Sequence, residues 1–150
     1  MPILVQTIKG DLMKGTMQEG VEYTLEFTVT DGKTVPKLYP ESKHFAGMPP
    51  VFATGYMVGF MEWACMEALA PHLDEGEISL GTHINVSHSA ATPVGMAVRA
   101  HVKCTGVDGQ RTMWEIDAYD EKDLIGKGTH ERFTVNLERF CKKLEAKSGS

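Results

Sequence analysis

The chain has 150 residues, of which 42% are hydrophobic and 23% are charged, a composition typical of one globular domain with a sizeable core. Its net charge of −5 argues against a nucleic-acid-binding protein, which needs Lys and Arg clustered on one face. Basic residues are scattered except for Lys142 and Lys143, so a local basic patch for the phosphates of a cofactor stays compatible with this total. Cys65, Cys104 and Cys141 do not have the spacing of a zinc or redox motif, which predicts reduced thiols in a cytoplasmic protein.

The N-terminus lacks the basic region, apolar run and cleavage site of a signal peptide. The most hydrophobic stretch, residues 51–73, contains two glutamates and a histidine and follows two prolines. These features favour a buried helix over a membrane span, so we expect no membrane partner. Because there is no internal repeat and no break in composition, we predict a single domain over residues 1–150, with its core at about residues 20–136.

The first third of the chain contains one clear strand and a long loop. Residues 3–14 are ambiguous, with a short strand before a turn at Gly15 as one interpretation. Apolar and polar residues alternate over residues 21–29, which predicts a half-buried strand, and Asp31-Gly32 marks the turn after it. Residues 34–50 hold four prolines and a glycine, which predicts a loop long enough to be a lid or a binding segment.

Pro49-Pro50 suits a helix start, and residues 51–69 are apolar on nearly every side, which predicts a helix surrounded by protein that ends near Pro71. The rest alternates as strands, with a hairpin signal at Asp108-Gly109. One helix on one face of an antiparallel sheet is an α+β arrangement, and its open edges predict a dimer. The later elements that we expect are strands at 80–88, 96–104, 111–119 and 124–135, and a short C-terminal helix at 137–147.

Glu62 is the most informative position, because its neighbours in the helix offer no polar face for it to share. Burying an unpartnered carboxylate is costly, so Glu62 either makes a structural hydrogen bond or faces a cavity where it acts. Thr54 lies eight residues earlier, about 12 Å along the helix axis, and on its own a helix cap explains it equally well. We therefore expect no contact between Thr54 and Glu62 of one chain; an extended substrate or a second subunit would have to join them.

Three later residues are further candidates. Alternation places His88 at the end of the apolar face of its strand, pointing toward the helix, where it can exchange protons near neutral pH; a hydrogen-bonded core histidine is the alternative. Gly81 permits close approach to the backbone, and its amide can polarise a carbonyl. Arg132 suits a phosphate or a carboxylate partner, or is a solvated strand residue.

The segments TVPKLYPES, MPPVFATGYMVGFMEWACMEAL, LGTHINVSHSAATPVG and GTHERFTV resemble the fluoroacetyl-CoA thioesterase-like branch of the hotdog superfamily over about residues 34–136. The resemblance implies a hotdog fold, an antiparallel sheet wrapped around one long central helix, in a homodimer that acts on an acyl-CoA substrate. It implies no metal and no cofactor beyond the CoA of the substrate. It also implies that Thr54, Glu62 and His88 form the catalytic set, with Gly81 as backbone donor to the thioester carbonyl and Arg132 as a substrate-binding arginine.

The loop before the helix departs from this branch. The fluoroacetyl-specific member closes its acyl pocket with aromatic residues, whereas here the loop offers one aromatic residue, Phe45, and the flexible Met48. Both stay predicted substrate-binding residues, but the resemblance implies the reaction rather than selectivity for fluoroacetyl-CoA. A small apolar pocket near Phe45, Met57 and Met61 predicts a short acyl group.

The predicted function is hydrolysis of a short-chain acyl-CoA to the free acid and CoA. Glu62 would be the general base toward water, or a nucleophile that forms a transient anhydride. His88 would protonate the leaving thiolate or activate water, while Thr54 and the Gly81 amide hold the acyl group or its oxyanion. Two alternatives remain: a hotdog enoyl-CoA hydratase, whose Asp-x-x-x-x-His arrangement is not evident here, and a non-catalytic acyl-CoA binding or sensor module.

Overall fold

The computed structural model describes residues 12–149, so most of the ambiguous segment 3–14 lies outside the described residues, while the turn at Gly15 is present. Two single-turn 3-10 helices, Asp31–Lys33 and Ala70–His72, flank the longer elements. The strands and α-helices in chain order are β1 (Glu22–Thr28), α1 (Val35–Leu38), α2 (Lys43–Ala46), α3 (Thr54–Leu69), β2 (Glu77–His88), β3 (Ala97–Asp108), β4 (Arg111–Tyr119), β5 (Leu124–Asn136) and α4 (Leu137–Ser148).

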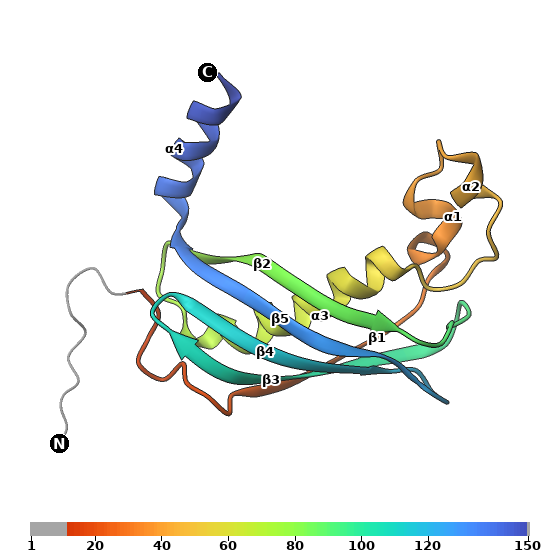
Figure 1. The fold of residues 1–150 in the computed structure, drawn as a ribbon, viewed down its shortest axis with the longest axis horizontal. Coiled ribbons are helices and arrows are strands. Elements are labelled where there is room, and N and C mark those ends of the chain that lie inside the picture. Colours follow the sequence, from red (N-terminus) through yellow and green to blue (C-terminus); the bar gives the residue numbers. More distant parts are fainter. Residues whose placement is uncertain (1–11, 150) are drawn as a thin grey trace.

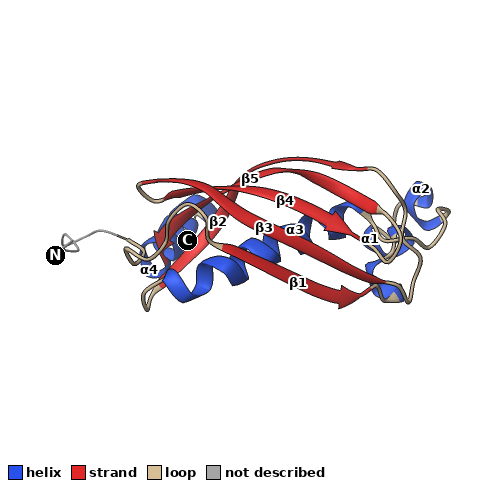
Figure 2. Ribbon diagram, turned by 90° about the horizontal axis from the view of Figure 1, so that it is seen from below, coloured by secondary structure: helices blue, strands red, loops and turns tan. Residues whose placement is uncertain are grey.

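The five strands form one antiparallel sheet in the order β1-β3-β4-β5-β2, and α3 lies across one face of it (Figures 1 and 2). This confirms the predicted α+β arrangement of a sheet around one long helix. The short helices α1 and α2 and the C-terminal helix α4 project beyond the sheet at opposite ends of the molecule (Figure 1). Because β1 and β2 are the two edges, each leaves a row of backbone groups unpaired within the described chain.

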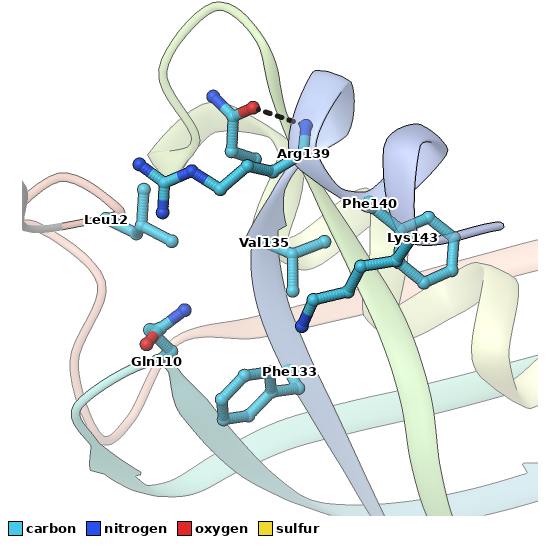
Figure 3. A pocket seen from close by; sticks show the side chains of 8 residues that line it. Leu12, Gln110, Phe133, Val135, Arg139, Phe140 and Lys143 are labelled. Atoms are coloured by element: carbon cyan, nitrogen blue, oxygen red, sulfur yellow. Dashed lines mark hydrogen bonds between the residues drawn. The ribbon is translucent and has the colours of Figure 1, made fainter. Parts of the chain in front are cut away.

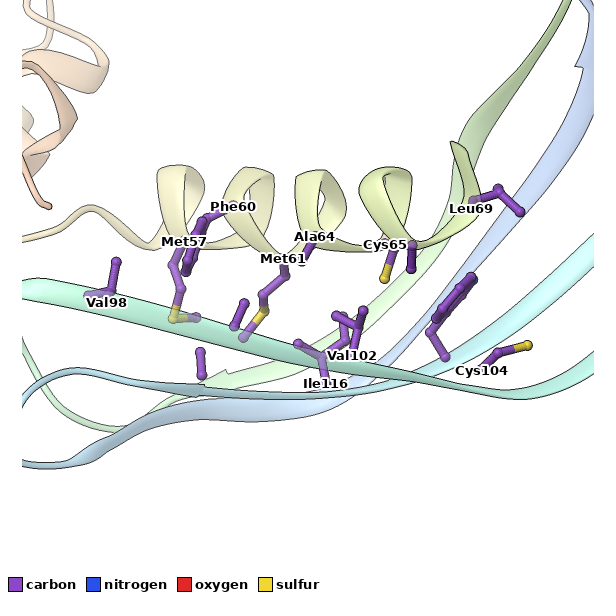
Figure 4. Packing of buried hydrophobic residues seen from close by; sticks show 14 of the residues in the cluster. Met57, Phe60, Met61, Ala64, Cys65, Leu69, Val98, Val102, Cys104 and Ile116 are labelled. Atoms are coloured by element: carbon purple, nitrogen blue, oxygen red, sulfur yellow. The ribbon is translucent and has the colours of Figure 1, made fainter. Parts of the chain in front are cut away.

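The core lies between α3 and the sheet (Figure 4). Met57 and Met61 of α3 are fully buried there, and β3 faces them with the alternate residues that the sequence pattern predicted, such as Val98 and Val102. Both side chains belong to the core, and the expected acyl pocket near Met57 and Met61 stays a prediction. Burial of apolar side chains stabilises the packing of the helix on the sheet, by about 25 cal/mol for each Å² of apolar surface removed from water.

The start of α3 differs from the prediction. The helix begins at Thr54 rather than near residue 51, because Val51 and Phe52 are extended and form bridges with Pro93 and Thr34. The predicted loop also contains α1 and α2; the Ser42 side chain caps α2 by accepting a hydrogen bond from an amide in its first turn. The bridges to Pro93 and Thr34 outweigh the helix signal of the two prolines.

The outer face of α3 is open in the single chain. Trp63 is 44% and Met66 is 47% exposed, so the prediction of a helix surrounded by protein is wrong for the isolated chain. Large apolar side chains on an open helix face are unusual for a helix that covers a core. The apolar character of this helix is therefore not explained by contacts within one chain.

Two glycines of β5 let β2 approach closely. Gly126 is the register partner of His88, and Gly128 pairs with Val86. A Cβ at Gly126 would overlap the Ser87 carbonyl oxygen and would lie 3.0 Å from the Met57 thioether, one turn into α3. The missing side chain at Gly126 therefore sets how closely the end of β2 and the start of α3 approach each other.

Candidate active site

Thr54 and His88 meet where α3 begins and β2 ends. The Thr54 hydroxyl Oγ1 lies 2.7 Å from Nδ1 of His88, so His88 faces the helix as alternation predicted. Ala53 is the N-cap residue of α3, which means that the Thr54 side chain is not the helix cap. Thr54 instead fixes one nitrogen of the His88 ring.

The second ring nitrogen of His88, Nε2, is buried and has no hydrogen-bond partner among residues 12–149. Burial lowers the pKa of His88 from 6.5, with the Ala90 carbonyl partly offsetting this effect, since a charged ring loses hydration. His88 is therefore neutral at neutral pH, with one nitrogen held by Thr54 and the other left for a substrate, a water or a second chain.

Glu62 forms a separate group with Arg132 of β5. Its Oε1 lies 3.3 Å from Nη1 of Arg132, and the two side chains are 38% and 3% exposed. The carboxylate is thus partly open in the single chain, whereas the sequence predicted it to be enclosed. It borders a hollow of about 360 Å³ at the β2 edge, whose other lining residues are Gly81, Thr82, His83, Ile84 and His130.

Gly81 lies against this carboxylate. A Cβ at Gly81 would sit 2.9 Å from Glu62 Oε1 and 3.4 Å from Arg132 Nη1. The strand is also irregular here, since its register shifts between Gly81 and His83. A glycine is needed for close approach, as the sequence indicated, but the group that approaches is the protein's own carboxylate. The role of the Gly81 amide toward a thioester carbonyl stays a prediction.

Arg132 is held by residues that the sequence analysis missed. Its Nε donates to Oγ of Ser79 at 2.8 Å and its Nη2 donates to the Ser79 carbonyl at 2.9 Å. Its Nη1 lies 3.1 Å from Nε2 of His130, which is itself 1% exposed. The period-two pattern of β5 offered a signal, because His130 and Arg132 share the inward face. The sequence left a phosphate partner, a carboxylate partner and a solvated residue as alternatives for Arg132, and in the single chain its partner is the Glu62 carboxylate. The role of Arg132 in binding substrate stays a prediction.

Cys65 lies close to this group but is not a nucleophile. Burial raises the pKa of the Cys65 thiol to about 12, with Arg132 opposing and Glu62 reinforcing the shift. Only the thiolate is reactive. Glu62 is therefore the candidate nucleophile or base on this side of the site.

The two groups are separate within one chain. Glu62 lies eight residues beyond Thr54 in α3, and Gly81 lies seven residues before His88 in β2, a separation of roughly 23 Å along a strand. No hydrogen bond or ion pair within residues 12–149 joins them. This agrees with the expectation that Thr54 and Glu62 of one chain do not touch.

The predicted acyl-binding loop lies on the α1–α2 side. Phe45 of α2 packs edge-to-face against Tyr39, with ring centroids 5.4 Å apart, and Met48 is 48% exposed. Their role toward a substrate stays a prediction.

A basic hollow of about 250 Å³ lies between β5 and α4. Figure 3 shows Arg139 and Lys143 of α4 on either side of an apolar floor that includes Phe133 and Val135. Asn136 fixes the start of α4 by accepting a hydrogen bond from the Arg139 amide at 3.0 Å.

In the part of the chain that the structure describes, no three His, Cys, Asp or Glu side chains gather as a metal site. None of the helices there combines the length and apolarity that a membrane span needs.

The fold defines the chain as a hotdog protein. It superposes on a hot-dog-like protein from Thermanaerovibrio acidaminovorans with a TM-score of 0.74 at 23% identity, covering 88% of this chain and 93% of that one. It also matches a Thermus thermophilus member of the thioesterase superfamily with a TM-score of 0.76 at 31% identity, covering 87% and 95%. The predicted hotdog fold is confirmed.

Closer similarity identifies the family. Residues 29–138 match the family described as fluoroacetyl-CoA-specific thioesterase. The fluoroacetyl-CoA thioesterase of Streptantibioticus cattleyicolor is 51% identical over 136 residues, covering 91% of this chain and 98% of the relative. A solved structure of a fluoroacetyl-CoA thioesterase superposes with a TM-score of 0.86 at 51% identity, covering 87% and 97%. The chain belongs to this thioesterase family, which confirms the resemblance drawn from the sequence and its assignment to the thioester hydrolases.

Proposed function

We propose that the protein hydrolyses short-chain acyl-CoA thioesters to a free acid and CoA. The observation that carries this proposal is the presence, in two separate groups of the chain, of an arginine-bound carboxylate, Glu62, and a neutral histidine, His88, whose Nε2 has no partner in the described chain. The family relatives support the substrate class, since structures of the relative are described as complexes with fluoroacetate, with fluoroacetate and CoA, or with acetyl-CoA. The exposed Met48 favours a substrate range wider than fluoroacetyl-CoA.

We propose an anhydride route. Glu62 attacks the thioester carbonyl carbon, the C–S bond breaks, and its electron pair leaves with the CoA thiolate. Nε2 of His88 then takes a proton from water as the water oxygen attacks the anhydride, which releases the acid and restores the Glu62 carboxylate. The proton on His88 passes to the thiolate, so thioester and water give acid and thiol. The Thr54 hydroxyl accepts from Nδ1–H and keeps Nε2 free, and the Gly81 amide faces the oxyanion.

We propose a homodimer in which two β2 edges pair antiparallel about a two-fold axis. Residues 81–85 of this edge are exposed, including the apolar Ile84 at 40%. With the axis between Ile84 and Asn85, Gly81 lies opposite His88 of the partner subunit. Each of two equal sites then combines Glu62 of one chain with Thr54 and His88 of the other. The dimer thus brings together the two groups that lie apart within a single chain.

We propose that the basic hollow of α4 binds the phosphates of CoA. Its lining residue Asn136 is four residues along β5 from Arg132, about 13 Å at strand spacing, comparable to the arm that links a thioester to the phosphates. Guanidinium and ammonium groups above an apolar floor suit phosphates beside an adenine ring.

We also propose that residues 1–150 form one domain in the cytoplasm. Cys65 and Cys104 are buried free thiols, and Cys141 is a free thiol at the surface. Free thiols at these positions suit a reducing compartment.

The test is release of free CoA from acetyl-, propionyl- and fluoroacetyl-CoA, followed with a thiol-reactive dye. We expect turnover by the wild type and a loss of about 100-fold or more in Glu62→Gln and His88→Ala, with the fold retained. The intact mass of rapidly quenched enzyme should gain the acyl group; turnover without this adduct would instead favour Glu62 as general base. Ligand-induced stabilisation without CoA release would identify a binding module, and hydration of an enoyl-CoA a hydratase.

A further inference from the structure

The buried histidine of β5 has both ring nitrogens engaged. Nδ1 of His130 lies 2.7 Å from the His83 carbonyl oxygen. A carbonyl only accepts hydrogen bonds, so Nδ1 carries the ring hydrogen. Nε2 lies 3.1 Å from Nη1 of Arg132, and a guanidinium only donates, so Nε2 carries the lone pair. The two contacts together fix one neutral tautomer.

The electrostatic surroundings agree with this tautomer. Burial is the main cause that lowers the pKa of His130, and the positive charge of Arg132 lowers it further; the His83 carbonyl and the Glu62 charge oppose these effects. The charged or titratable groups that face the ring are Glu62 of α3, His83 of β2 and Arg132 of β5. A second proton would sit on Nε2, directly against a guanidinium donor.

Arg132 has little freedom once these bonds are made. Two bonds to Ser79 fix one side of the guanidinium plane, and the bond to His130 fixes Nη1. The same Nη1 donates to Glu62 Oε1 at 3.3 Å. Among residues 12–149, the one hydrogen bond of the Glu62 side chain goes to Oε1, which leaves Oε2 for the reaction.

We propose that His130 is a positioning residue for catalysis: by accepting from Nη1 it orients Arg132, and through Arg132 it aims the free oxygen of Glu62 at the substrate. This inference rests on the proposed role of Glu62 in hydrolysis. His130 itself touches neither substrate nor reacting atoms. Nothing in the sequence separates this role from that of an ordinary core histidine, because it depends on which atom each ring nitrogen meets.

A matched pair of variants tests the role. The amide of Asn reaches the place of Nδ1, so His130→Asn keeps a donor to His83 and loses the acceptor for Arg132. The amide of Gln reaches the place of Nε2, so His130→Gln keeps an acceptor for Arg132. We expect kcat to fall by about 10- to 100-fold in the Asn variant with KM unchanged, and by only about threefold in the Gln variant. Equal kcat values in the two variants would overturn the proposal, because a merely structural histidine predicts no such difference.

Two measurements are independent of turnover. In ¹⁵N-histidine NMR spectra of the wild type, His130 should stay neutral with its hydrogen on Nδ1 throughout the range from pH 8 to below 6.5, the ordinary histidine value. In crystal structures, the Glu62 carboxylate should be displaced in His130→Asn and retained in His130→Gln. A hydrogen on Nε2, or an unmoved carboxylate in the Asn variant, would refute the inference. If the wild type released no CoA, the proposed function would fail, while these measurements would still decide what His130 holds in place.

Discussion

Gly81 limits where the Glu62 carboxylate can lie, because a Cβ there would come within 2.9 Å of Oε1. Gly81→Ala should push the carboxylate away from Arg132 and lower kcat by about 10- to 100-fold. The fold should survive, since the atom that must move is the end of a flexible side chain. Steady-state kinetics and thermal denaturation measure the two effects. Gly32→Ala is the control, because a Cβ at Gly32 meets nothing within 4 Å; equal kinetics in both variants would contradict the steric account.

His88 should set the acidic limb of the pH–rate profile. Burial lowers its pKa from 6.5, so the neutral base persists to lower pH than an exposed histidine would. We expect kcat/KM to stay level as the pH falls to 6.5 and to drop below it, with a midpoint under 6.5. His101→Gln, which removes an exposed histidine paired with Glu22, should leave the profile unchanged. A midpoint above 6.5 would contradict this role of His88.

At the scale of an element, α4 should serve the nucleotide end of the substrate. Arg139→Gln combined with Lys143→Gln should raise KM for acyl-CoA by about tenfold, equivalent to about 1.4 kcal/mol, and leave kcat unchanged. An acyl-pantetheine substrate has no nucleotide, so its KM should not change. Lys142→Gln combined with Lys147→Gln removes the same two positive charges outside the hollow and should have no effect. A KM increase for both substrates would show a general disturbance rather than lost phosphate contacts.

Periodicity predicted the elements well, and their ends less well. Alternation and hairpin signals placed β1 and β4 within about two residues of their observed ends, and the helical period did the same for α4, because these patterns are local in the sequence. The start of α3 could not be predicted, since Val51 and Phe52 are held extended by bridges to Pro93 and Thr34. Those partners lie far away in the sequence, and a local pattern carries no information about them.

The sequence likewise predicted only those features of the site that depend on local patterns. Alternation alone placed His88 toward the helix, and helix geometry separated Thr54 from Glu62. The Arg132 contacts with Ser79 could not be predicted, because they depend on the pairing of β2 with β5 across more than 40 residues. The contact with His130 was missed although both residues lie on the inward face of β5. The openness of Glu62 was also missed, since an apolar helix gives no indication of whether its own chain or a second one covers it.

At the scale of the whole molecule, the proposed dimer predicts complementation between two inactive chains. A heterodimer of Glu62→Gln with His88→Ala should contain one working site of two, and therefore about half of the wild-type activity. Co-expression with different tags isolates this heterodimer, and light scattering verifies its mass. If each site were built from one chain, the heterodimer would be as inactive as either parent. The homodimers of each variant, purified in the same way, are the controls.

Gly126 is a position where the enzyme depends on an absent side chain. It lies opposite His88 in the sheet and beneath the first turn of α3, so the hydrogen bond of 2.7 Å between Thr54 and His88 forms only because nothing stands between helix and strand. This makes residue 126 a marker for reading other members of the family. A member with threonine and histidine at the matching positions but a bulky residue here would hold its helix farther from its sheet. Such a member would need another way to orient its histidine, although its two most recognisable residues were intact.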